Sequence, residues 1–460
     1  MRALGTPRQG SGAPVAGPAS VLQRNGDTRL AVPSPAMNLR HRARALAPVF
    51  AWVFTRACMV MYVFHELWAR PSQRWVPVLI SNFLTVDYFN YATKLSAGLA
   101  PYRSFSYEYP PGTLPFLAAG HWTSQVTDFV ALWVAMMLVL DAITALVLWR
   151  WSRAAGRGAL WLWVAALPLL GPLVLVRNDL IVACPFVAAG WLVATNRFRI
   201  AGAVWAFAVF AKLWPLAPFV MYTIARREGR RRFLTGALIV AAGITGWLAA
   251  WGVLGAMVSD LFMRHGHRPL EIETSWAITA LLAAAARGVH LRLQFSYGSL
   301  NVVEGFPSWT PALAYRLTYL IELAGIAAVV ALRWRHRARP PLNAVAWLTL
   351  AVVSGSLAAA PVLSPQYVLW LIAAACVVLA CEHTATSRVI AVSVCAAAAL
   401  TQLDYPVLFN HIASGRLDGL IVAETRNVLL AVIAVIATVA GVRRARSAGQ
   451  GEHSLCERVG

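Results

Sequence analysis

The fold of this chain is decided by two consecutive apolar runs, ALWLWVAALPLLGPLVLV at residues 159–176 and DLIVACPFVAAGWLVAT at residues 179–195. Each comes close to the roughly 20 residues that an α-helix needs to cross a bilayer. Only Arg177 and Asn178 separate the two runs. Further arginines lie before the first run, within 150–157, and after the second, within 197–199. Because cytoplasmic loops are enriched in Lys and Arg, the pattern predicts two membrane helices joined by a short polar corner on the extracytoplasmic side.

Similar apolar runs recur along the chain, near residues 46–66, 128–149, 200–211, 214–225, 233–254, 311–332, 342–361, 366–381, 388–402 and 423–442. Hydrophobic residues make up 59% of the 460 residues and charged residues only 13%, whereas soluble globular proteins carry roughly 25% charged residues. We therefore predict an all-α fold, a polytopic transmembrane helical bundle of about 11–12 membrane segments with helical extracytoplasmic loops.

The formal net charge of +21 would suit a nucleic-acid-binding protein, but the arginines occur in short clusters between the apolar runs. Such clusters are typical of cytoplasmic loops, and they can also attract anionic membrane lipids. We therefore predict a multi-pass plasma-membrane protein with both termini in the cytoplasm and no nucleic-acid partner. The clusters lie at 40–44, 150–157, 197–199, 226–232, 333–339 and 443–446.

The two ends of the chain lack the apolar pattern. Residues 1–38 are rich in Pro, Gly, Ser and Ala and contain no apolar run of signal-peptide length. We predict a disordered cytoplasmic tail there, a transmembrane domain over 39–442, and a second disordered cytoplasmic tail over 443–460. A start of translation at Met37 also fits the sequence, because a basic run follows it.

The cysteines show no sign of a disulfide framework or a zinc site. Five of the six lie in or at the edge of apolar runs, and none forms a CxxC pair. We interpret them as small buried hydrophobic residues. They are Cys58, Cys184, Cys376, Cys381, Cys395 and Cys456.

One pair of apolar runs is too short to cross the membrane. Residues 200–211 and 214–225 would each span roughly 18 Å as a helix, against a hydrocarbon core of about 30 Å. This predicts a hairpin that leaves a cavity beneath it, with Lys212 at its apex pointing at that cavity. A cation at this depth is by default a functional-site hypothesis, although a lysine can instead extend to the interface.

The first polar loop contains TVDYFNY at 85–91, GLAPY at 98–102 and YEYPPG at 107–112. We predict a short helix from Thr85, as its cap, to about residue 97, with Gly98 as its stop. Asp87, Tyr91 and Lys94 then share one helix face. A carboxylate in the first turn is favoured in its ionised form, as a general base requires, but it can equally serve only to start the helix.

These motifs resemble the first extracytoplasmic loop of the polytopic GT-C glycosyltransferases, in particular glycosyltransferase family 87. The resemblance implies that Asp87 is catalytic and takes the proton from the acceptor hydroxyl as that oxygen attacks the anomeric carbon of the sugar. Glu108 is the second carboxylate candidate. The resemblance also makes Tyr91, Tyr102 and Tyr109 candidates for substrate contacts.

The resemblance extends over most of residues 45–440 through three further short elements. A Lys-x-x-Pro element begins at Lys212, and an Arg-x-Asp corner joins Arg177 to Asp179. The resemblance implies that Lys212 and Arg177 are candidates for holding the phosphate and that Asp179 is a further site residue; the corner can also be a plain neutralised turn. A Ser-Pro turn at 364–365 implies that Gln366 and Tyr367 face the sugar. The Trp and paired histidines that follow this turn in mannosyl-transferring members are absent, so mannose is not indicated.

The stretch RHGHRPLEIETSW at 264–276 is a second candidate for binding an anion, because it puts four potential cations on the side where few are expected. A solvated loop with salt bridges is the alternative. The His-Gly-His spacing beside two arginines is unsuited to a metal, so we predict none. The substrate-binding candidates are Arg264, His265, His267, Arg268, Glu271 and Ser275.

Together these patterns predict an inverting glycosyltransferase that uses a polyprenyl-phosphate sugar and a glycan or glycolipid acceptor on the extracytoplasmic face, without a cofactor. No phosphate-binding Gly-rich loop or nucleotide-sugar motif occurs, which favours a lipid-linked donor. A transporter or flippase for lipid-linked saccharides is the alternative. Transporters often carry interrupted helices at corresponding positions of two halves, and here only one short hairpin is found.

Overall fold

The computed structural model describes residues 35–68, 83–152, 157–265, 268–336 and 340–447. The predicted tails lie largely outside these residues, although α18 (Leu417–Ser447) runs through 443–447. The chain divides into a unit that ends at Ala47 and a second unit that starts at Pro48. The helix α1 (Pro35–Trp68) begins in the first unit, and the description that follows concerns the second.

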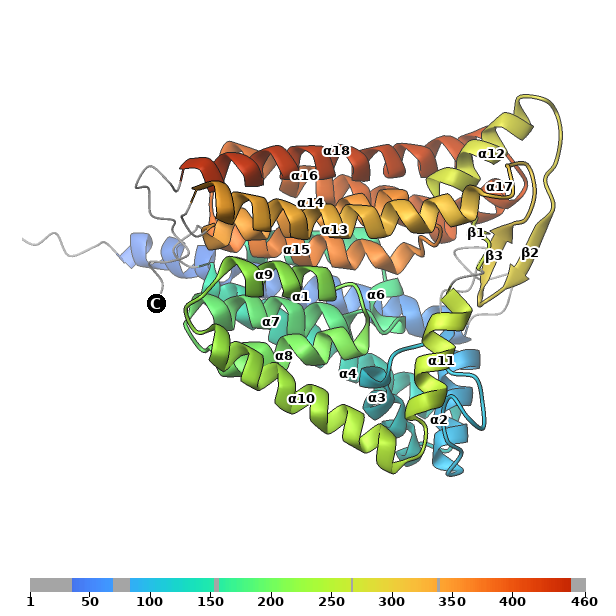
Figure 1. The fold of residues 1–460 in the computed structure, drawn as a ribbon, viewed down its shortest axis with the longest axis horizontal. Coiled ribbons are helices and arrows are strands. Elements are labelled where there is room, and N and C mark those ends of the chain that lie inside the picture. The colour runs from blue at the N-terminus through green and yellow to red at the C-terminus, as the bar shows by residue number, and fades with distance from the viewer. Residues whose placement is uncertain (1–34, 69–82, 153–156, 266–267, 337–339, 448–460) are drawn as a thin grey trace, which may run out of the picture. The chain divides into compact units, whose positions relative to one another are not determined.

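Long apolar helices form most of the second unit (Figure 1). Seven of the described helices are long and apolar enough to cross a membrane, and this confirms the predicted all-α, polytopic class. Besides α1 and α18, they are α4 (Val126–Trp151), α10 (Arg230–Ala250), α13 (Thr310–His336), α14 (Leu342–Ala359) and α16 (Ala385–Gln402). The predicted number of membrane passes stays a prediction.

Shorter apolar helices accompany the long ones. They are α5 (Gly158–Leu170), α7 (Leu180–Ala194), α8 (Phe198–Ala211), α9 (Leu216–Ala225), α12 (Ser275–Ala285) and α15 (Val368–Cys381). α8 packs between α7 and α10, α14 packs on α18, and α5 lies against α15 and α16. The brevity of α8 and α9 agrees with the predicted short hairpin.

The uniform hydrophobicity of the apolar run at 159–176 suggested one continuous helix, but the run does not form one. It forms α5 and a separate turn, α6 (Leu173–Val176). Gly171 has a φ of +86° and Pro172 has no N–H to donate, so the helix cannot continue through this pair. The break brings the chain directly into the polar corner at residues 177–179.

A buried ion pair ties α1 to α4 inside the apolar bundle. Asp141 accepts hydrogen bonds from Arg56 Nε at 2.8 Å and from Trp163 Nε1 at 2.6 Å. Arg56 Nη1 also donates to the carbonyl of Val164 at 3.1 Å. This carbonyl lacks its usual helical donor because Pro168, four residues later, has no N–H. The proline therefore creates the acceptor that the arginine uses.

The loops between 83 and 310 contain several short elements. They are the π-helical turn η2 (Phe83–Tyr88), α2 (Phe89–Ser96), η3 (Pro111–Thr113), α3 (Leu114–Ala118), η4 (Ala119–Trp122), α11 (Leu254–His265) and the strands β1 (Leu270–Glu271), β2 (Leu293–Ser296) and β3 (Ser299–Val302). The strands form an antiparallel sheet in the order β1-β3-β2. The loops therefore contain this small sheet in addition to the predicted helices.

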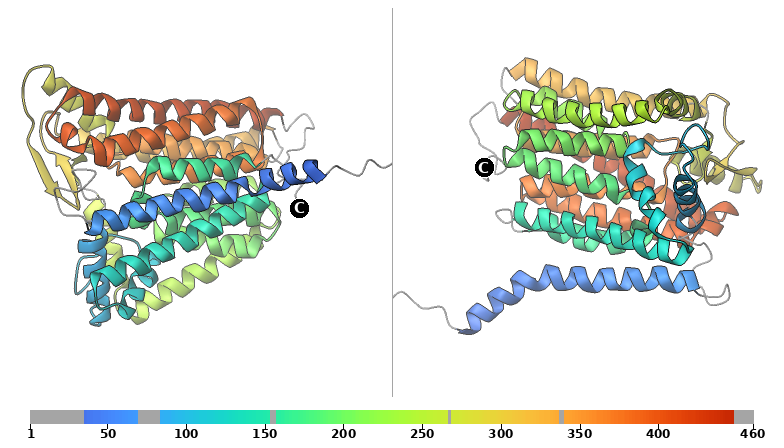
Figure 2. Two further views of the ribbon diagram at one scale, coloured as in Figure 1. Left: turned by 180° about the vertical axis from the view of Figure 1, so that it is seen from behind. Right: turned by 90° about the horizontal axis from the view of Figure 1, so that it is seen from below.

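The small sheet lies at the same end of the long helices as α2, α11, α12 and α17 (Phe409–Ala413), as Figures 1 and 2 show. The turns at 177–179, 212–215 and 364–367 line cavities at this end together with residues of the sheet. The segments that the sequence grouped on one side of the membrane therefore come together in the structure.

Candidate active site

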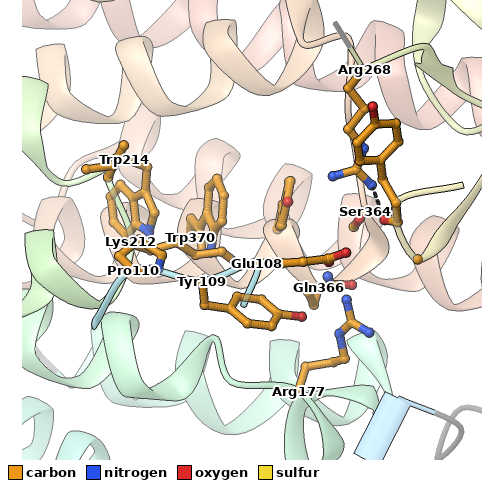
Figure 3. A pocket seen from close by; sticks show the side chains of 14 residues that line it. Glu108, Tyr109, Pro110, Arg177, Lys212, Trp214, Arg268, Ser364, Gln366 and Trp370 are labelled. Carbon is orange, nitrogen blue, oxygen red and sulfur yellow. Dashed lines mark hydrogen bonds between the residues drawn. The ribbon is translucent and has the colours of Figure 1, made fainter. Parts of the chain in front are cut away.

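A cavity of about 240 Å³ lies where the α8–α9 turn, the α6–α7 corner and the start of α15 meet (Figure 3). Three cations, Arg177, Lys212 and Arg268, line this cavity beside one carboxylate, Glu108. We call it the cationic cavity. Its other lining residues are Tyr109, Pro110, Leu213, Trp214, Tyr297, Gly298, Ser364, Gln366, Tyr367 and Trp370.

Lys212 reaches the cationic cavity because α8 ends at the residue before it. Gly112 packs so close to the end of α8 that a Cβ there would lie 2.7 Å from the backbone N of Ala211. The Tyr-Pro-Pro-Gly corner thus needs this glycine to approach the helix. Pro215, which occupies the N-cap position of α9, then starts the second helix of the hairpin.

Lys212 is paired with a neighbouring carboxylate. Its Nζ donates to Asp179 Oδ1 at 2.7 Å, and it lies 4.6 Å from the ring centre of Tyr367 and 4.9 Å from that of Trp370. Asp179 Oδ1 also accepts from Trp370 Nε1 at 2.7 Å. The ring of Trp370 in turn stacks on Trp214. The ammonium group is therefore held by one carboxylate and two aromatic faces.

Arg177 is buried at the polar corner between α6 and α7. In the amide orientation that satisfies both groups, the side-chain oxygen of Gln366 accepts from Arg177 Nε at 3.3 Å and from Nη2 at 2.6 Å. This contact joins the corner to η5 (Pro365–Tyr367), the turn that precedes α15. Arg177 and Gln366, which the sequence indicated as separate candidates, are therefore in direct contact.

A second cavity, of about 360 Å³, adjoins the first and shares Arg177, Gly298, Ser364 and Gln366 with it. Three carboxylates, Asp87, Glu271 and Glu273, line this cavity. Among the described residues that line it, Arg177 is the only Lys or Arg. We call it the acidic cavity. Its remaining lining residues are Val86, Leu173, Ile272, Phe295, Ser299, Leu300, Pro365, Tyr405 and Phe409.

Asp87 lies in η2, in the last helical turn before α2. The helix already includes Phe83, so Thr85 lies inside it and the predicted Thr85 cap was wrong. Gly98, with a φ of +77°, follows the end of α2, as predicted. Burial raises the pKa of the half-buried Asp87 carboxyl, and nearby Arg177 partly opposes this. We expected a position at the helix start to favour the ionised form of Asp87. Burial instead makes this carboxylate more basic than usual.

The aromatic residues of the first loop take different places. Tyr109 lines the cationic cavity, and its backbone carbonyl accepts a hydrogen bond from the Tyr102 hydroxyl at 2.7 Å. Tyr91 stacks on Phe105, and Lys94 lies over the same ring. Tyr91 and Tyr102 line neither cavity and instead pack the loop that carries Tyr109 and Glu108.

The stretch at 264–276 divides between the two cavities. Arg268 lines the cationic cavity, where its Nη2 donates to Tyr297 O and to Ser299 Oγ, both at 2.9 Å. Glu271 lines the acidic cavity and accepts from Ser364 Oγ at 2.9 Å. Ser275 donates to the carbonyl of Ala358 and so holds α12 to the end of α14. The described residues of this stretch therefore lie at both cavities, and its role in binding an anion stays a prediction.

The three other cationic candidates of this stretch cannot be assigned to a cavity. The side chains of Arg264 and His265 lie outside the described part of the structure, and so does the whole of His267. Among the described residues, no three His, Cys, Asp or Glu side chains come together in a way that could hold a metal ion.

Sequence analysis missed Glu273, Tyr405 and the β2–β3 hairpin as site elements. Burial raises the pKa of the Glu273 carboxyl well above its usual value, and nearby Asp404 adds to this effect. The signal available in the sequence was a second carboxylate close to Glu271, although a turn joins the two, closed by a hydrogen bond from Thr274 N to the carbonyl of Glu271 at 3.0 Å. No comparable signal marked Tyr405 or the hairpin.

The fold and these adjoining cavities define a polytopic helical membrane protein with a two-part polar site. Residues 107–365, more than half of the chain, match the model of Glycosyltransferase family 87. The chain therefore belongs to this family and is a glycosyltransferase. The matched segment includes Glu108, Lys212 and Glu271 but begins after Asp87. Comparison with curated proteins and with solved structures gives no match.

Proposed function

We propose that this glycosyltransferase is an inverting enzyme that moves a sugar from a polyprenyl-phosphate donor to a cell-envelope glycan or glycolipid on the extracytoplasmic face. The observation that carries the proposal is the opposite charge of two adjoining cavities that share Arg177. A phosphate and a proton-accepting carboxylate can then act on opposite sides of one sugar.

The cationic cavity suits the phosphate of the donor. Arg177, Lys212 and Arg268 line it, and arginine binds phosphate oxygens through paired N–H groups. The same cations would stabilise the negative charge that develops on the leaving phosphate, which is a main source of rate in such reactions. The pairing of Lys212 with Asp179 leaves the two arginines as the principal phosphate ligands in this proposal.

A third cavity next to the cationic one is the proposed place for the first part of the donor's lipid chain, although polar side chains, Thr318 and Glu322 among them, line it beside apolar ones. It has a volume of about 210 Å³ and shares Trp214, Arg268, Tyr367 and Trp370 with the cationic cavity. Its other walls come from α13 and α14, and α13 exposes Leu320 and Leu323. The position of this cavity beside the cationic one, with exposed leucines nearby on α13, favours a lipid-linked donor over a nucleotide sugar.

Asp87 is the proposed base. Its carboxylate takes the proton of the acceptor hydroxyl as that oxygen forms a bond to the anomeric carbon. The bond between this carbon and the phosphate oxygen breaks on the opposite face, and the phosphate leaves with the electron pair. Attack from the face opposite to the leaving group inverts the configuration at the anomeric carbon.

The test uses purified protein in nanodiscs, offered a radiolabelled sugar either on polyprenyl phosphate or on a nucleotide. Transfer to an envelope extract from the lipid donor alone is the expected result. Transfer from the nucleotide sugar alone would overturn the proposed donor. Movement of a lipid-linked saccharide across proteoliposomes without any transfer would instead favour the flippase alternative.

A further inference from the structure

Two buried carboxylates in the acidic cavity each have an oxygen without a hydrogen-bond partner in the part of the chain that the structure describes. Glu271 is 4% exposed and Glu273 is 2% exposed. Glu271 Oε2 and Glu273 Oε1 are buried and have no hydrogen-bond partner among the described residues. A buried polar atom without a partner costs free energy. Two such oxygens on the wall of one cavity indicate a ligand that carries hydrogen-bond donors.

The backbone around these carboxylates is firmly held. Glu271 N donates to the carbonyl of Pro361 at 3.0 Å. The carbonyl of Glu273 accepts from Arg426 Nη2 at 2.6 Å and from Asn427 Nδ2 at 3.1 Å. Arg426 is itself paired with Asp404. The contacts fix the Glu-Ile-Glu segment and, among the described residues, leave one oxygen of each carboxylate without a partner, as a preformed binding site requires.

An aromatic ring lies at the edge of the same cavity. Phe295 lines the acidic cavity although it is 73% exposed. It belongs to β2, which a two-residue turn joins to β3. Both turn residues, Tyr297 and Gly298, have positive φ angles, as a tight hairpin requires.

The hairpin that carries Phe295 is rigid. Asn301 is fully buried, and its amide donates to Ser296 O at 2.9 Å and to Ser299 O at 3.0 Å. Arg268 secures the turn from the other cavity through the carbonyl of Tyr297. The Phe295 ring is therefore presented on a fixed support rather than on a free loop.

Carboxylates that accept from hydroxyls, beside an aromatic ring, form a surface suited to a sugar. A sugar ring offers hydroxyl donors at its edges and C–H groups on its faces, and an aromatic face can cover the latter. An anionic ligand would find one arginine, Arg177, and no lysine among the described lining residues, and this arginine already donates to Gln366. The buried charge of the ligand would therefore lack cationic partners, which disfavours it. The chemistry of the cavity thus selects a neutral saccharide.

We propose that the acidic cavity is the acceptor subsite for a neutral saccharide, whose hydroxyls donate to Glu271 and Glu273 and whose ring face contacts Phe295. This inference rests on the proposed function and names the chemical class of its acceptor. It assigns to Glu271 a role opposite to the anion binding that the sequence suggested.

The direct test measures binding without a donor. Saturation-transfer NMR on protein in nanodiscs would use neutral disaccharides of glucose, galactose, mannose and arabinose, with a matched glucuronate-containing disaccharide. At least one neutral probe should bind more than tenfold tighter than the glucuronate probe. The variants Glu273→Gln and Phe295→Ala should each weaken that binding about tenfold, the size that about 1.4 kcal/mol produces. Trp309→Ala, an exposed aromatic on the same loop that lines none of the cavities described above, is the matched control.

Equal or tighter binding of the glucuronate probe would overturn the inference, and so would unchanged binding in both variants. A turnover assay separates this failure from that of the proposed function. Normal transfer from a polyprenyl-phosphate sugar with an unchanged acceptor KM in both variants would refute the proposed subsite and leave the proposed function standing. If the wild-type protein transfers from no lipid-linked donor, the proposed function fails whatever the disaccharides do.

Discussion

Lys212 Nζ lies 2.7 Å from Asp179 Oδ1, so the cation at the apex of the short hairpin is already balanced inside the protein. The Asp179 side chain is only 1% exposed, and its Oδ2 has no hydrogen-bond partner among the described residues. Removing the lysine alone would leave a buried carboxylate with only Trp370 as donor. The pair therefore has two separable consequences, one for stability and one for the charge of the cationic cavity.

The first prediction separates these consequences. Lys212→Met should destabilise the protein by about 3–5 kcal/mol, because it leaves a buried charge unpaired. The double variant Lys212→Met with Asp179→Asn should recover much of the melting temperature, since it removes both charges. If Lys212 also aids the leaving phosphate, donor turnover in the double variant should stay about 10²–10³-fold low. Melting in nanodiscs and turnover at limiting lipid donor are the measurements. Full recovery of both would show that Lys212 is only structural.

The ion pair between Arg56 and Asp141 provides a second prediction. Asp141→Asn keeps the size of the side chain but leaves Arg56, which is 3% exposed, as a buried cation. We expect a loss of about 3–5 kcal/mol. The joint replacement Arg56→Met with Asp141→Leu should restore most of the stability. Because neither residue lines the two cavities, transfer per folded molecule should not change. A single Asp141→Asn variant with normal melting would contradict the argument.

The helical class could be predicted because apolar runs of membrane length have few other stable structures. The Gly171-Pro172 pair also indicated a helix break, but the apolar residues on both sides of it suggested one continuous helix. The Thr85 cap failed because helical backbone already includes Phe83 two residues earlier. A capping residue identifies a helix start only where the flanking pattern is clear.

The division of the site into two cavities could not be predicted from the sequence. Arg268 and Glu271 are three residues apart, yet they face cavities of opposite charge. Their separation depends on the pairing of β1 with β3, in which Glu271 lies opposite Asn301. That register joins segments about thirty residues apart, and periodicity within one segment carries no information about it. Arg177 and Gln366, by contrast, were both identified, but their contact was not.

Membrane orientation is a separate prediction. If the arginine clusters are cytoplasmic, a reporter fused after Gly112 should lie outside the cell, and one fused after Gly229 should lie inside. Alkaline phosphatase activity reports the first location and green fluorescence the second. Phosphatase activity after Gly229, or fluorescence after Gly112, would place the two cavities on the wrong side for the proposed reaction.

The catalytic prediction concerns Asp87. Asp87→Asn keeps the size of the side chain but cannot accept the proton, and loss of a general base typically costs about 10²–10⁴-fold in rate. The variant should accumulate in the membrane normally, because Asp87 is only half buried. Asp128→Asn, which changes an exposed carboxylate in the first turn of α4, is the control and should transfer normally. Near-normal transfer by purified Asp87→Asn would refute the mechanism and make Glu108 the next carboxylate to test.

The pH dependence of transfer tests the environment of Asp87. Burial raises its pKa, and the base works only when ionised, so activity should be present above that pKa and lost as the pH falls through it. The acidic limb of kcat/KM should therefore lie above the value of about 3.9 that an exposed aspartate has. Arg177 opposes the effect of burial, so Arg177→Gln should move this limb to still higher pH, besides slowing transfer. A slower variant whose acidic limb has not moved would show that Arg177 acts on the substrate alone and that another group sets the limb.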